Sequence, residues 1–281
     1  MIVIMVRFVG LTPSPPTVTH VIPGDNWITA MTSLGDDVFV VRYGSEQVEV
    51  HDAVTFTLQR HLSVPGLGNS YGLAACAINR CLYASDYNNS HIHRVELSGS
   101  NAVMKWSVGR PAGLTVTSAK NVLVVIQWEC KLQEFTTHGT LLQTIQLQRD
   151  IQRPRRVVEL SNGQFVISHI GRHHRVCLLD VEGGVVRSYG EAWGSDLTKM
   201  DWPGDLAVDK RENILVADEF NNRLLVLRRS LFAREMSVIV DGGLRRPSSL
   251  WYDKSRGRLY IGERYGRRVI IIDYLKDFTT L

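Results

Sequence analysis

The sequence predicts an all-β protein, a six-bladed β-propeller of four-stranded antiparallel blades that is closed by an N-terminal strand completing the last blade. Two observations predict this fold. A pattern of short apolar runs separated by polar turns recurs about every 44 residues. The apolar runs have hairpin spacing and are far too short to span a bilayer. We therefore expect one repeat domain over residues 17–281, preceded by an N-terminal extension of residues 1–16.

The clearest repeat unit spans residues 203–227. Within it, residues 206–208 and 214–217 read as two short strands around a polar hairpin turn. A polar loop at residues 218–223 then leads to a third strand. A fourth apolar run follows in most units, so each unit supplies the four strands of one blade.

The residue that ends the second strand marks each unit, because it follows an apolar run and precedes a polar loop. The six marker residues are Arg42, Asp86, Gln127, His169, Asp218 and Glu263. About five to seven residues after each marker, another apolar run begins, as at Val48 and Leu224. Six such units of four strands indicate a six-bladed propeller.

The blades follow one another along the chain. We expect them at about residues 27–64, 71–108, 112–147, 155–189, 204–240 and 248–274. The last blade has three clear strands of its own. We expect residues 17–22 to form its missing outer strand, which would close the ring and remove an exposed sheet edge.

The string from Pro203 to Leu227 is similar to the NHL repeat, which reads roughly Pro-x-Gly-Leu-Ala-Val-Asp and then Ile-x-Val-Ala-Asp-x-x-Asn-x-Arg-Ile-x-Val. Nearly every position of the repeat pattern is matched here, and the second and sixth blades keep much of the same sequence pattern. The other tandem-repeat candidate, the Trp-Asp propeller, has the right period, but no Trp-Asp dipeptide closes any unit. The chain most resembles the C-terminal propeller of tripartite-motif NHL proteins.

This resemblance implies a binding role. In tripartite-motif NHL proteins the propeller captures RNA or a protein, and a separate RING carries out ubiquitin transfer. No cysteine-rich RING or B-box pattern occurs in this sequence, so ligase activity is not expected within it. The resemblance therefore implies either an RNA-binding module or a substrate receptor in a ubiquitin-ligase system.

One face of the propeller is the expected binding surface. Loops between the second and third strands share a face with the links between blades, and arginines and aromatic residues interleave there. Arginine can hold phosphates while aromatic rings stack bases, so we expect RNA or a protein partner on this face, and no membrane. The candidate residues are Tyr43, Tyr71, Tyr87, Arg110, Trp128, Arg153, Arg155, Arg156, Arg172, His173, His174, Arg175, Trp202, Phe220, Arg245, Arg246, Arg264, Tyr265, Arg267 and Arg268.

These candidates have structural alternatives. Arg223 occupies the arginine position of the repeat pattern and is expected to brace a blade rather than to contact a ligand. Asp86 and Asp218 are expected to cap turns. The aromatic residues could equally pack between blades, and the paired arginines of the last three blades could equally form a solvated surface.

The charge distribution gives modest support to an anionic partner. The net charge is +4, and its positive excess lies in residues 153–281, where 22 Lys and Arg face 17 Asp and Glu. Arginine supplies 25 of the 32 basic residues, and its planar fork suits phosphates and carboxylates better than lysine does.

No catalytic or cofactor-binding constellation is evident. Calcium-dependent propeller hydrolases need a ring of Asp, Glu and Asn residues where the first strands enter the channel. The entry residues here are Trp27, Gly72, Gly113, Arg156, Asp205 and Ser249, with one acid among the six. We find no Gly-x-Ser-x-Gly elbow, no phosphate-binding loop and no histidine set like that of the amidating lyases. We expect a non-enzymatic, monomeric module without metal or cofactor.

The cysteines carry no strong signal. Cys76, Cys81, Cys130 and Cys177 form no dense framework. Cys76 and Cys81 flank a hairpin and could be bridged, but reduced thiols in a cytoplasmic protein are the expectation.

Overall fold

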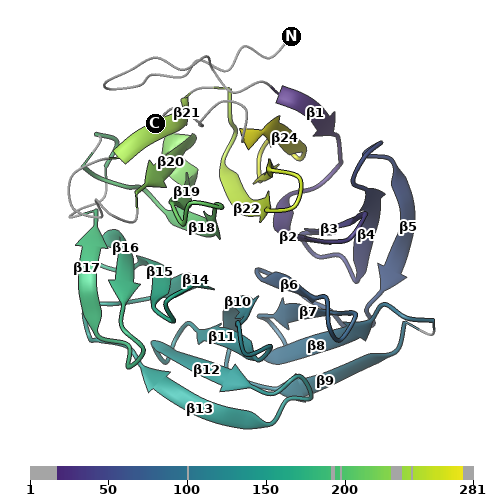
Figure 1. Ribbon diagram of the computed structural model, residues 1–281, viewed down its shortest axis with the longest axis horizontal. Helices are drawn as coiled ribbons and strands as arrows, with labels where there is room; N and C mark the ends of the chain where they lie inside the picture. The colour runs from purple at the N-terminus through teal and green to yellow at the C-terminus, as the bar shows by residue number, and fades with distance from the viewer. Residues whose placement is uncertain are drawn as a thin grey trace.

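The computed structural model describes residues 18–99, 101–190, 194–196, 198–228, 236–241 and 243–274. The expected N-terminal extension, residues 1–16, lies outside these residues. The described chain forms six sheets of four antiparallel strands, arranged as blades around a central channel (Figure 1). The prediction of an all-β, six-bladed propeller is therefore confirmed. No helix in the described part of the chain is long and apolar enough to cross a membrane.

In blades 1 to 5, strands run along the chain from the channel outward. Blade 1 contains β2 (Ile28–Leu34), β3 (Asp37–Arg42), β4 (Gln47–Asp52) and β5 (Leu58–Ser63). Blade 2 contains β6 (Leu73–Cys76), β7 (Cys81–Asp86), β8 (His91–Glu96) and β9 (Val103–Ser107). Blade 3 contains β10 (Pro111–Val116), β11 (Val122–Ile126), β12 (Lys131–Phe135) and β13 (Leu141–Gln146).

The remaining three blades follow the same plan. Blade 4 contains β14 (Pro154–Glu159), β15 (Phe165–Ile170), β16 (His174–Leu179) and β17 (Val185–Tyr189). Blade 5 contains β18 (Pro203–Val208), β19 (Ile214–Asp218), the 3-10 turn η1 (Glu219–Asn221), β20 (Arg223–Leu227) and β21 (Met236–Asp241). Blade 6 contains β22 (Pro247–Asp253), β23 (Arg258–Glu263), β24 (Val269–Asp273) and, from the other end of the chain, β1 (Val18–Ile22).

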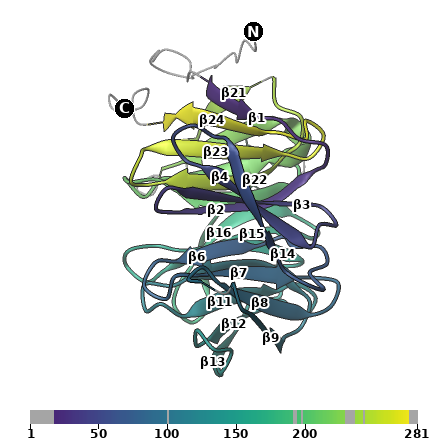
Figure 2. The ribbon, with the colours of Figure 1, turned by 90° about the vertical axis from the view of Figure 1, so that its right-hand side faces the viewer.

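The ring is closed by pairing the two ends of the fold. β1 runs antiparallel to β24, with Ile22 opposite Val269 and Val18 opposite Ile272. Figures 1 and 2 show β1 beside β24 at the outer edge of blade 6. The predicted closing strand is therefore confirmed from residue 18 onward. This pairing covers the outer edge of β24, which would otherwise be open to another strand.

The hydrophobic core lies between neighbouring blades. One cluster joins Leu224 of blade 5 to Ile261 of blade 6, and another joins Ile28 of blade 1 to Tyr260 of blade 6. A strand with a blade on each side is buried on both faces. For this reason β11 is apolar and buried at every position rather than alternating.

The innermost strands approach one another so closely that glycine is required between them. A Cβ atom at Gly72 would lie 2.8 Å from the backbone nitrogen of Leu114. A Cβ atom at Gly113 would lie 2.6 Å from the carbonyl oxygen of Arg155 and 2.9 Å from Cα of Arg156. All three contacts are shorter than a Cβ atom tolerates, so these two glycines set the spacing of blades 2, 3 and 4 around the channel.

Cys76 and Cys81 lie directly opposite each other on β6 and β7. Both are buried, and all four cysteines are free thiols. Burial raises the pKa of the Cys81 thiol, which keeps it protonated and weakly nucleophilic.

Candidate functional site

The six marker residues are structural. Every one is at most 8% exposed, and each stands at or next to the end of the second strand of its blade. Asp86, for example, accepts a hydrogen bond from the backbone nitrogen of Asn89 at 3.1 Å, which closes the loop that follows. The expectation that Asp86 caps a turn is confirmed. The markers hold the loops of one propeller face, and the residues beyond them are the ones displayed.

Arg223 braces blade 5, as expected from its place in the repeat. Its Nε donates to Oδ2 of Asp218 at 2.7 Å. Its terminal nitrogens donate to the carbonyl oxygens of Ser195 and Lys199, both at 2.8 Å. The guanidinium therefore ties the link before blade 5 to the loop within the blade, and it is buried.

Arg268 has the same role in blade 6, which corrects its assignment as a loop residue available to a ligand. Its Nε donates to Oε2 of Glu263 at 2.6 Å, and Nη2 donates to the carbonyl oxygen of Gly243 at 3.1 Å. Glu263 itself is fully buried. The sequence held the signal, because Arg268 follows Glu263 by the same five positions that separate Arg223 from its own marker acid.

Arg156 also lies away from the loops. It stands inside the channel on β14, is 5% exposed, and places Nε 3.0 Å from Oδ1 of Asp205 on the neighbouring blade. Asp205 is held by the backbone nitrogens of Leu206 and Leu250 as well. The signal for this position was again in the sequence, since Arg156 and Asp205 are both channel-entry residues. Arg156 is therefore not part of the displayed face.

Most remaining arginines and aromatic residues meet around the channel mouth. The guanidinium carbon of Arg155 lies 5.6 Å from the ring centroid of Tyr71 and 5.5 Å from that of Trp202. The guanidinium carbon of Arg153 lies 5.7 Å from the ring of Trp202 and 5.9 Å from that of Trp128. These are cation–π distances. Arg153 and Arg155, at the start of blade 4, thus connect three aromatic side chains: Tyr71, Trp128 and Trp202.

The same alternation continues over blades 5 and 6. Arg246 lies over Phe220, with its guanidinium carbon 3.7 Å from the ring centroid, and 5.1 Å from the ring of Tyr265. Phe220 in turn stacks on Trp202, with ring centroids 5.0 Å apart and planes 4° from parallel. The rings and arginines therefore form one continuous series across the links into blades 4, 5 and 6.

Blade 1 completes the series through a residue that was not among the candidates. Arg264 lies 5.4 Å from the ring of Trp27, which also contacts Tyr43 at a centroid distance of 4.9 Å and Tyr265 at 6.1 Å. From the sequence, Trp27 is assigned only to the position where the first strand of blade 1 enters the channel. Its aromatic character and its position in a link between blades are the features that it shares with Trp202.

On blades 2 and 3 the series is held by hydrogen bonds. Trp128 donates from Nε1 to the hydroxyl of Tyr87 at 2.7 Å, and that hydroxyl donates to Oε1 of Gln127 at 3.0 Å. Arg110 lies 5.9 Å from the ring of Tyr87, and Tyr71 meets the same ring edge-on at 5.5 Å. We call the whole set the arginine–aromatic belt. Its members are Trp27, Tyr43, Tyr71, Tyr87, Arg110, Trp128, Arg153, Arg155, Trp202, Phe220, Arg246, Arg264 and Tyr265.

Several rings of the belt face solvent. Trp128 is 58% exposed and Tyr265 is 56% exposed, while Tyr43 and Phe220 are each 37% exposed. The values for Trp128, Tyr265 and Tyr43 argue against packing between blades as the main role of these three rings, because a ring that fills an interior site is covered on both faces. Phe220 differs, since its ring lies between Arg246 and Trp202. The belt therefore presents flat apolar surface next to positive charge.

The links into blades 4, 5 and 6 share an unusual backbone conformation. Arg153, Trp202 and Arg246 have φ values of 50°, 63° and 57°, and each directly precedes the proline that begins the first strand of its blade. A left-handed backbone at a non-glycine residue costs about 1–2 kcal/mol. Such strain concentrates at functional positions, where the surrounding structure maintains it.

A buried carboxylate lies beneath the belt, and sequence reasoning missed it. Glu219 is fully buried in η1, with Oε1 placed 3.2 Å from Nε of Arg264. Burial raises the pKa of Glu219, and the positive charges of Arg264, Arg155 and Arg246 oppose that rise. One carboxylate faces three guanidinium groups, so positive charge remains at the surface above it.

The other candidates lie on the same face but outside the belt. His174 accepts a hydrogen bond at Nδ1 from the backbone nitrogen of Trp202 at 3.1 Å, and burial lowers the pKa of His174. Arg175 lies 3.5 Å from a carboxylate oxygen of Asp150. The remaining loop positions are Arg172, His173, Arg245 and Arg267. His174 therefore supports the link that carries Trp202, rather than acting as a displayed ligand contact.

The belt is a surface and not a deep pocket. The cavity at this mouth measures only about 10 Å³ and is lined by Tyr71, Arg155 and Arg264 among others. In the part of the chain that the structure describes, no group of three or more His, Cys, Asp or Glu side chains is placed to hold a metal ion.

Comparisons with known proteins support the fold. No protein-family model and no curated protein sequence matches the chain. Among solved structures, hydrazine synthase from Kuenenia stuttgartiensis is 14% identical, with a TM-score of 0.66 over 94% of this chain and 99% of that chain. Streptogramin B lyase is 12% identical, with a TM-score of 0.64 over 95% and 97% of the two chains. Virginiamycin B lyase from Staphylococcus aureus is 9% identical, with a TM-score of 0.63 over 90% and 98%.

These likenesses establish the β-propeller fold and nothing narrower, because the identities are so low. The similarity of residues 203–227 to the NHL repeat rests on the sequence alone.

Proposed function

We propose that the chain is a non-catalytic binding module that holds single-stranded RNA on the arginine–aromatic belt. The resemblance to the propellers of tripartite-motif NHL proteins suggests this role. The observation that supports it most is the alternation of guanidinium groups and solvent-facing rings around one channel mouth. Proteins that bind single strands combine these two elements, since rings stack bases and cations follow the backbone.

The geometry of the belt suits an unpaired strand. Trp128 and Tyr265 each offer an exposed ring face, and each has an arginine within 6 Å of its centroid, Arg153 at 5.9 Å and Arg246 at 5.1 Å. A base stacked on either ring would therefore have its phosphate within reach of a guanidinium group. Stacking of this kind contributes about 1–3 kcal/mol per base.

We propose no chemical step for the belt. Its ionised groups are guanidinium ions, which stay protonated at neutral pH and supply neither a general base nor a nucleophile. The solved structures similar to this chain include proteins named as a synthase and as lyases. At the identities given above, their activities do not extend to this chain.

The proposal can be tested by titrating a fluorescein-labelled 12-nucleotide single-stranded RNA with the protein and measuring anisotropy. Trp128→Ala and Tyr265→Ala should each weaken binding by about 1–3 kcal/mol. Arg153→Glu and Arg246→Glu should weaken it as well, because each reverses a charge beside an exposed ring. Lys210→Glu and Ile78→Ala are matched controls, since both residues are exposed in hairpin turns on the opposite face.

A protein partner is the alternative occupant of the belt. Tryptophan, tyrosine and arginine are also the residues that dominate protein–protein interfaces. If the RNA does not bind at low salt, or if none of the four belt substitutions changes its affinity, the RNA proposal fails. The belt would then be better explained as the receptor surface of a ubiquitin-ligase system.

A further inference from the structure

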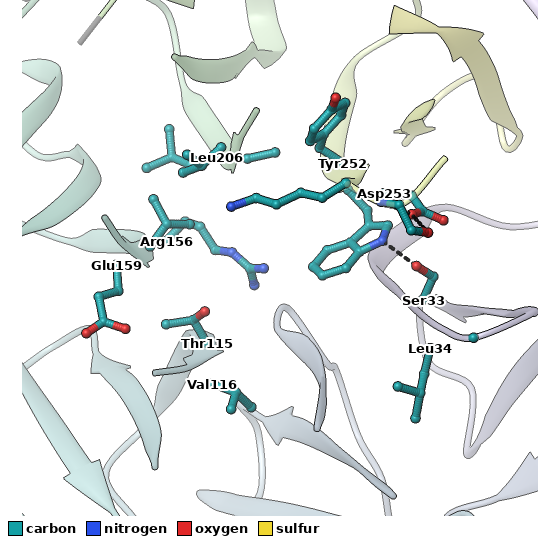
Figure 3. A pocket seen from close by; sticks show the side chains of 16 residues that line it. Ser33, Leu34, Thr115, Val116, Arg156, Glu159, Leu206, Tyr252 and Asp253 are labelled. Atoms are coloured by element: carbon teal, nitrogen blue, oxygen red, sulfur yellow. Dashed lines mark hydrogen bonds between the residues drawn. The ribbon is translucent and has the colours of Figure 1, made fainter. Parts of the chain in front are cut away.

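The channel mouth opposite the belt opens into a cavity of about 410 Å³ that the proposed function does not use. Its walls come from the ends of the first strands and the hairpins that follow them in five of the six blades. These wall segments include residues 33–35, 115–116, 158–159, 206–208 and 251–255. Figure 3 shows the lining side chains converging from several blades on one space. The volume lies in the range of small-molecule binding sites.

One wall of the cavity is an oriented aromatic ring. Trp251 donates a hydrogen bond from its indole Nε1 to Oγ of Ser33 at 2.8 Å, drawn in Figure 3 as the dashed line that ends at Ser33. This bond joins blade 6 to blade 1 and holds the indole in place. Val116 and Leu206 supply apolar surface on other sides. A flat, apolar group could therefore lie against Trp251 and be enclosed.

The polar element of the cavity is a buried cation. Arg156 is 5% exposed, and Figure 3 shows its guanidinium directed into the cavity. Its Nε lies 3.0 Å from Asp205, but within the described chain that nitrogen has no partner with hydrogen-bond geometry. A second cation, the exposed Lys254, also lines the cavity.

The carboxylates near the cavity already have partners within the protein. Asp205 accepts hydrogen bonds from the backbone nitrogens of Leu206 and Leu250, Glu159 accepts from the backbone and hydroxyl of Ser118, and Asp253 accepts from Ser255 and Arg256. The cations Arg156 and Lys254 are less fully satisfied than these acids. The cavity therefore combines an apolar aromatic wall with donors that favour a negative group.

We propose that this cavity is a binding site for a small organic anion, a molecule with one or two fused rings that carries a single carboxylate or sulfonate. The ring system lies against Trp251 and the apolar wall, and the acid group accepts hydrogen bonds from Arg156 and Lys254. The site is separate from the belt, so its ligand and RNA bind at opposite ends of the channel.

The test uses two fluorescent probes with the same rings. 1-Anilinonaphthalene-8-sulfonate carries the acid group, and N-phenyl-1-naphthylamine lacks it. The proposal predicts saturable binding of the sulfonate to the full chain and a drop in affinity of at least ten-fold in the double variant Arg156→Gln/Asp205→Asn. This double variant removes the cation without leaving Asp205 charged and unpaired. Affinity for the uncharged probe should change by less than two-fold.

Two further variants keep the test decisive if the double variant does not fold, as judged by circular dichroism. Lys254→Ala should weaken the sulfonate about three-fold and leave the uncharged probe unchanged, whereas Lys210→Ala, an exposed lysine in a neighbouring hairpin, should change neither. Val116→Trp should fill the cavity and abolish binding of both probes. The proposal is overturned if wild-type protein does not bind the sulfonate saturably, or if its affinity survives Lys254→Ala and Val116→Trp unchanged.

Discussion

Arg267 and Arg268 are neighbours in sequence with different roles in the structure. Replacing each by alanine therefore tests whether Arg268 braces blade 6. Arg268 binds the buried carboxylate of Glu263 at 2.6 Å and the carbonyl oxygen of Gly243 at 3.1 Å. Arg267 is exposed at the tip of the same loop. Composition alone treats the two as an equivalent pair, and only the five-residue spacing from Glu263 distinguishes Arg268.

The expected cost of Arg268→Ala follows from what it leaves behind. Removing one partner of a buried ion pair costs about 3–5 kcal/mol, because the remaining charge stays buried without compensation. Arg268 is itself only partly buried, and Glu263 keeps a hydrogen bond from the backbone nitrogen of Arg245 at 2.7 Å. We therefore expect the low end, about 3 kcal/mol. At roughly 2–4 °C per kcal/mol, the melting temperature should fall by about 6–12 °C.

Arg267→Ala should change the free energy of unfolding by less than about 0.5 kcal/mol, as is usual for an exposed side chain. Thermal unfolding followed by circular dichroism measures both variants under the same conditions. RNA affinity should show the reverse order. Arg267→Ala should weaken binding slightly because it removes an exposed positive charge on the same face as the belt, and Arg268→Ala should leave binding unchanged because that guanidinium is already paired with Glu263. Equal melting temperatures for the two alanine variants would refute the brace that we assign to Arg268.

Three further predictions concern the scaffold. Burial, reinforced by the charge of Arg175, lowers the pKa of His169 to about 4. In the unfolded chain the imidazole of His169 is protonated below about pH 6.5, so acid favours the unfolded state. The free energy of unfolding should therefore fall by about 2 kcal/mol between pH 6.5 and pH 5. Urea titrations should show a flatter pH dependence for His169→Leu, and an unchanged slope would contradict this assignment. Gly113→Ala should lower the free energy of unfolding by about 1–3 kcal/mol, because its Cβ would lie 2.6 Å from the backbone of blade 4. A melting temperature equal to that of the wild type would show that blades 3 and 4 can move apart without loss of stability. EDTA should leave the melting temperature unchanged, and a marked drop would reveal a structural metal ion.

The blade plan could be predicted from sequence because it depends on local patterns. Two-sided burial makes the central strands continuously apolar, and hairpin turns interrupt them at regular intervals, so the six markers identified the blades. The closing strand also followed, since a last blade with three strands leaves an edge that another segment must cover. Neither inference needs knowledge of side-chain contacts.

The division of arginines into braces and displayed residues could be read from the sequence only in part: the five-residue spacing after the marker acid identifies Arg223 and Arg268, but composition does not show what Arg155 contacts. Arg155 and Arg156 are adjacent, yet the irregular pairing at the start of β14 places one at the belt and the other within the channel. Glu219 was missed because its role depends on burial and on arginines from other blades. The cavity near Trp251 was missed for the same reason, since its walls come from five blades that are distant in sequence.

The most direct test of the central claim is the salt dependence of RNA binding by the belt. Each phosphate contacted in a single strand contributes about −0.7 to the slope of log affinity against log salt concentration. Three to five contacts by belt arginines predict a slope of about −2 to −3.5, and Arg246→Glu should make it shallower by about 0.7 or more. A slope near zero, or a slope that Arg246→Glu leaves unchanged while Lys210→Glu reduces it, would contradict the assignment of RNA binding to this face.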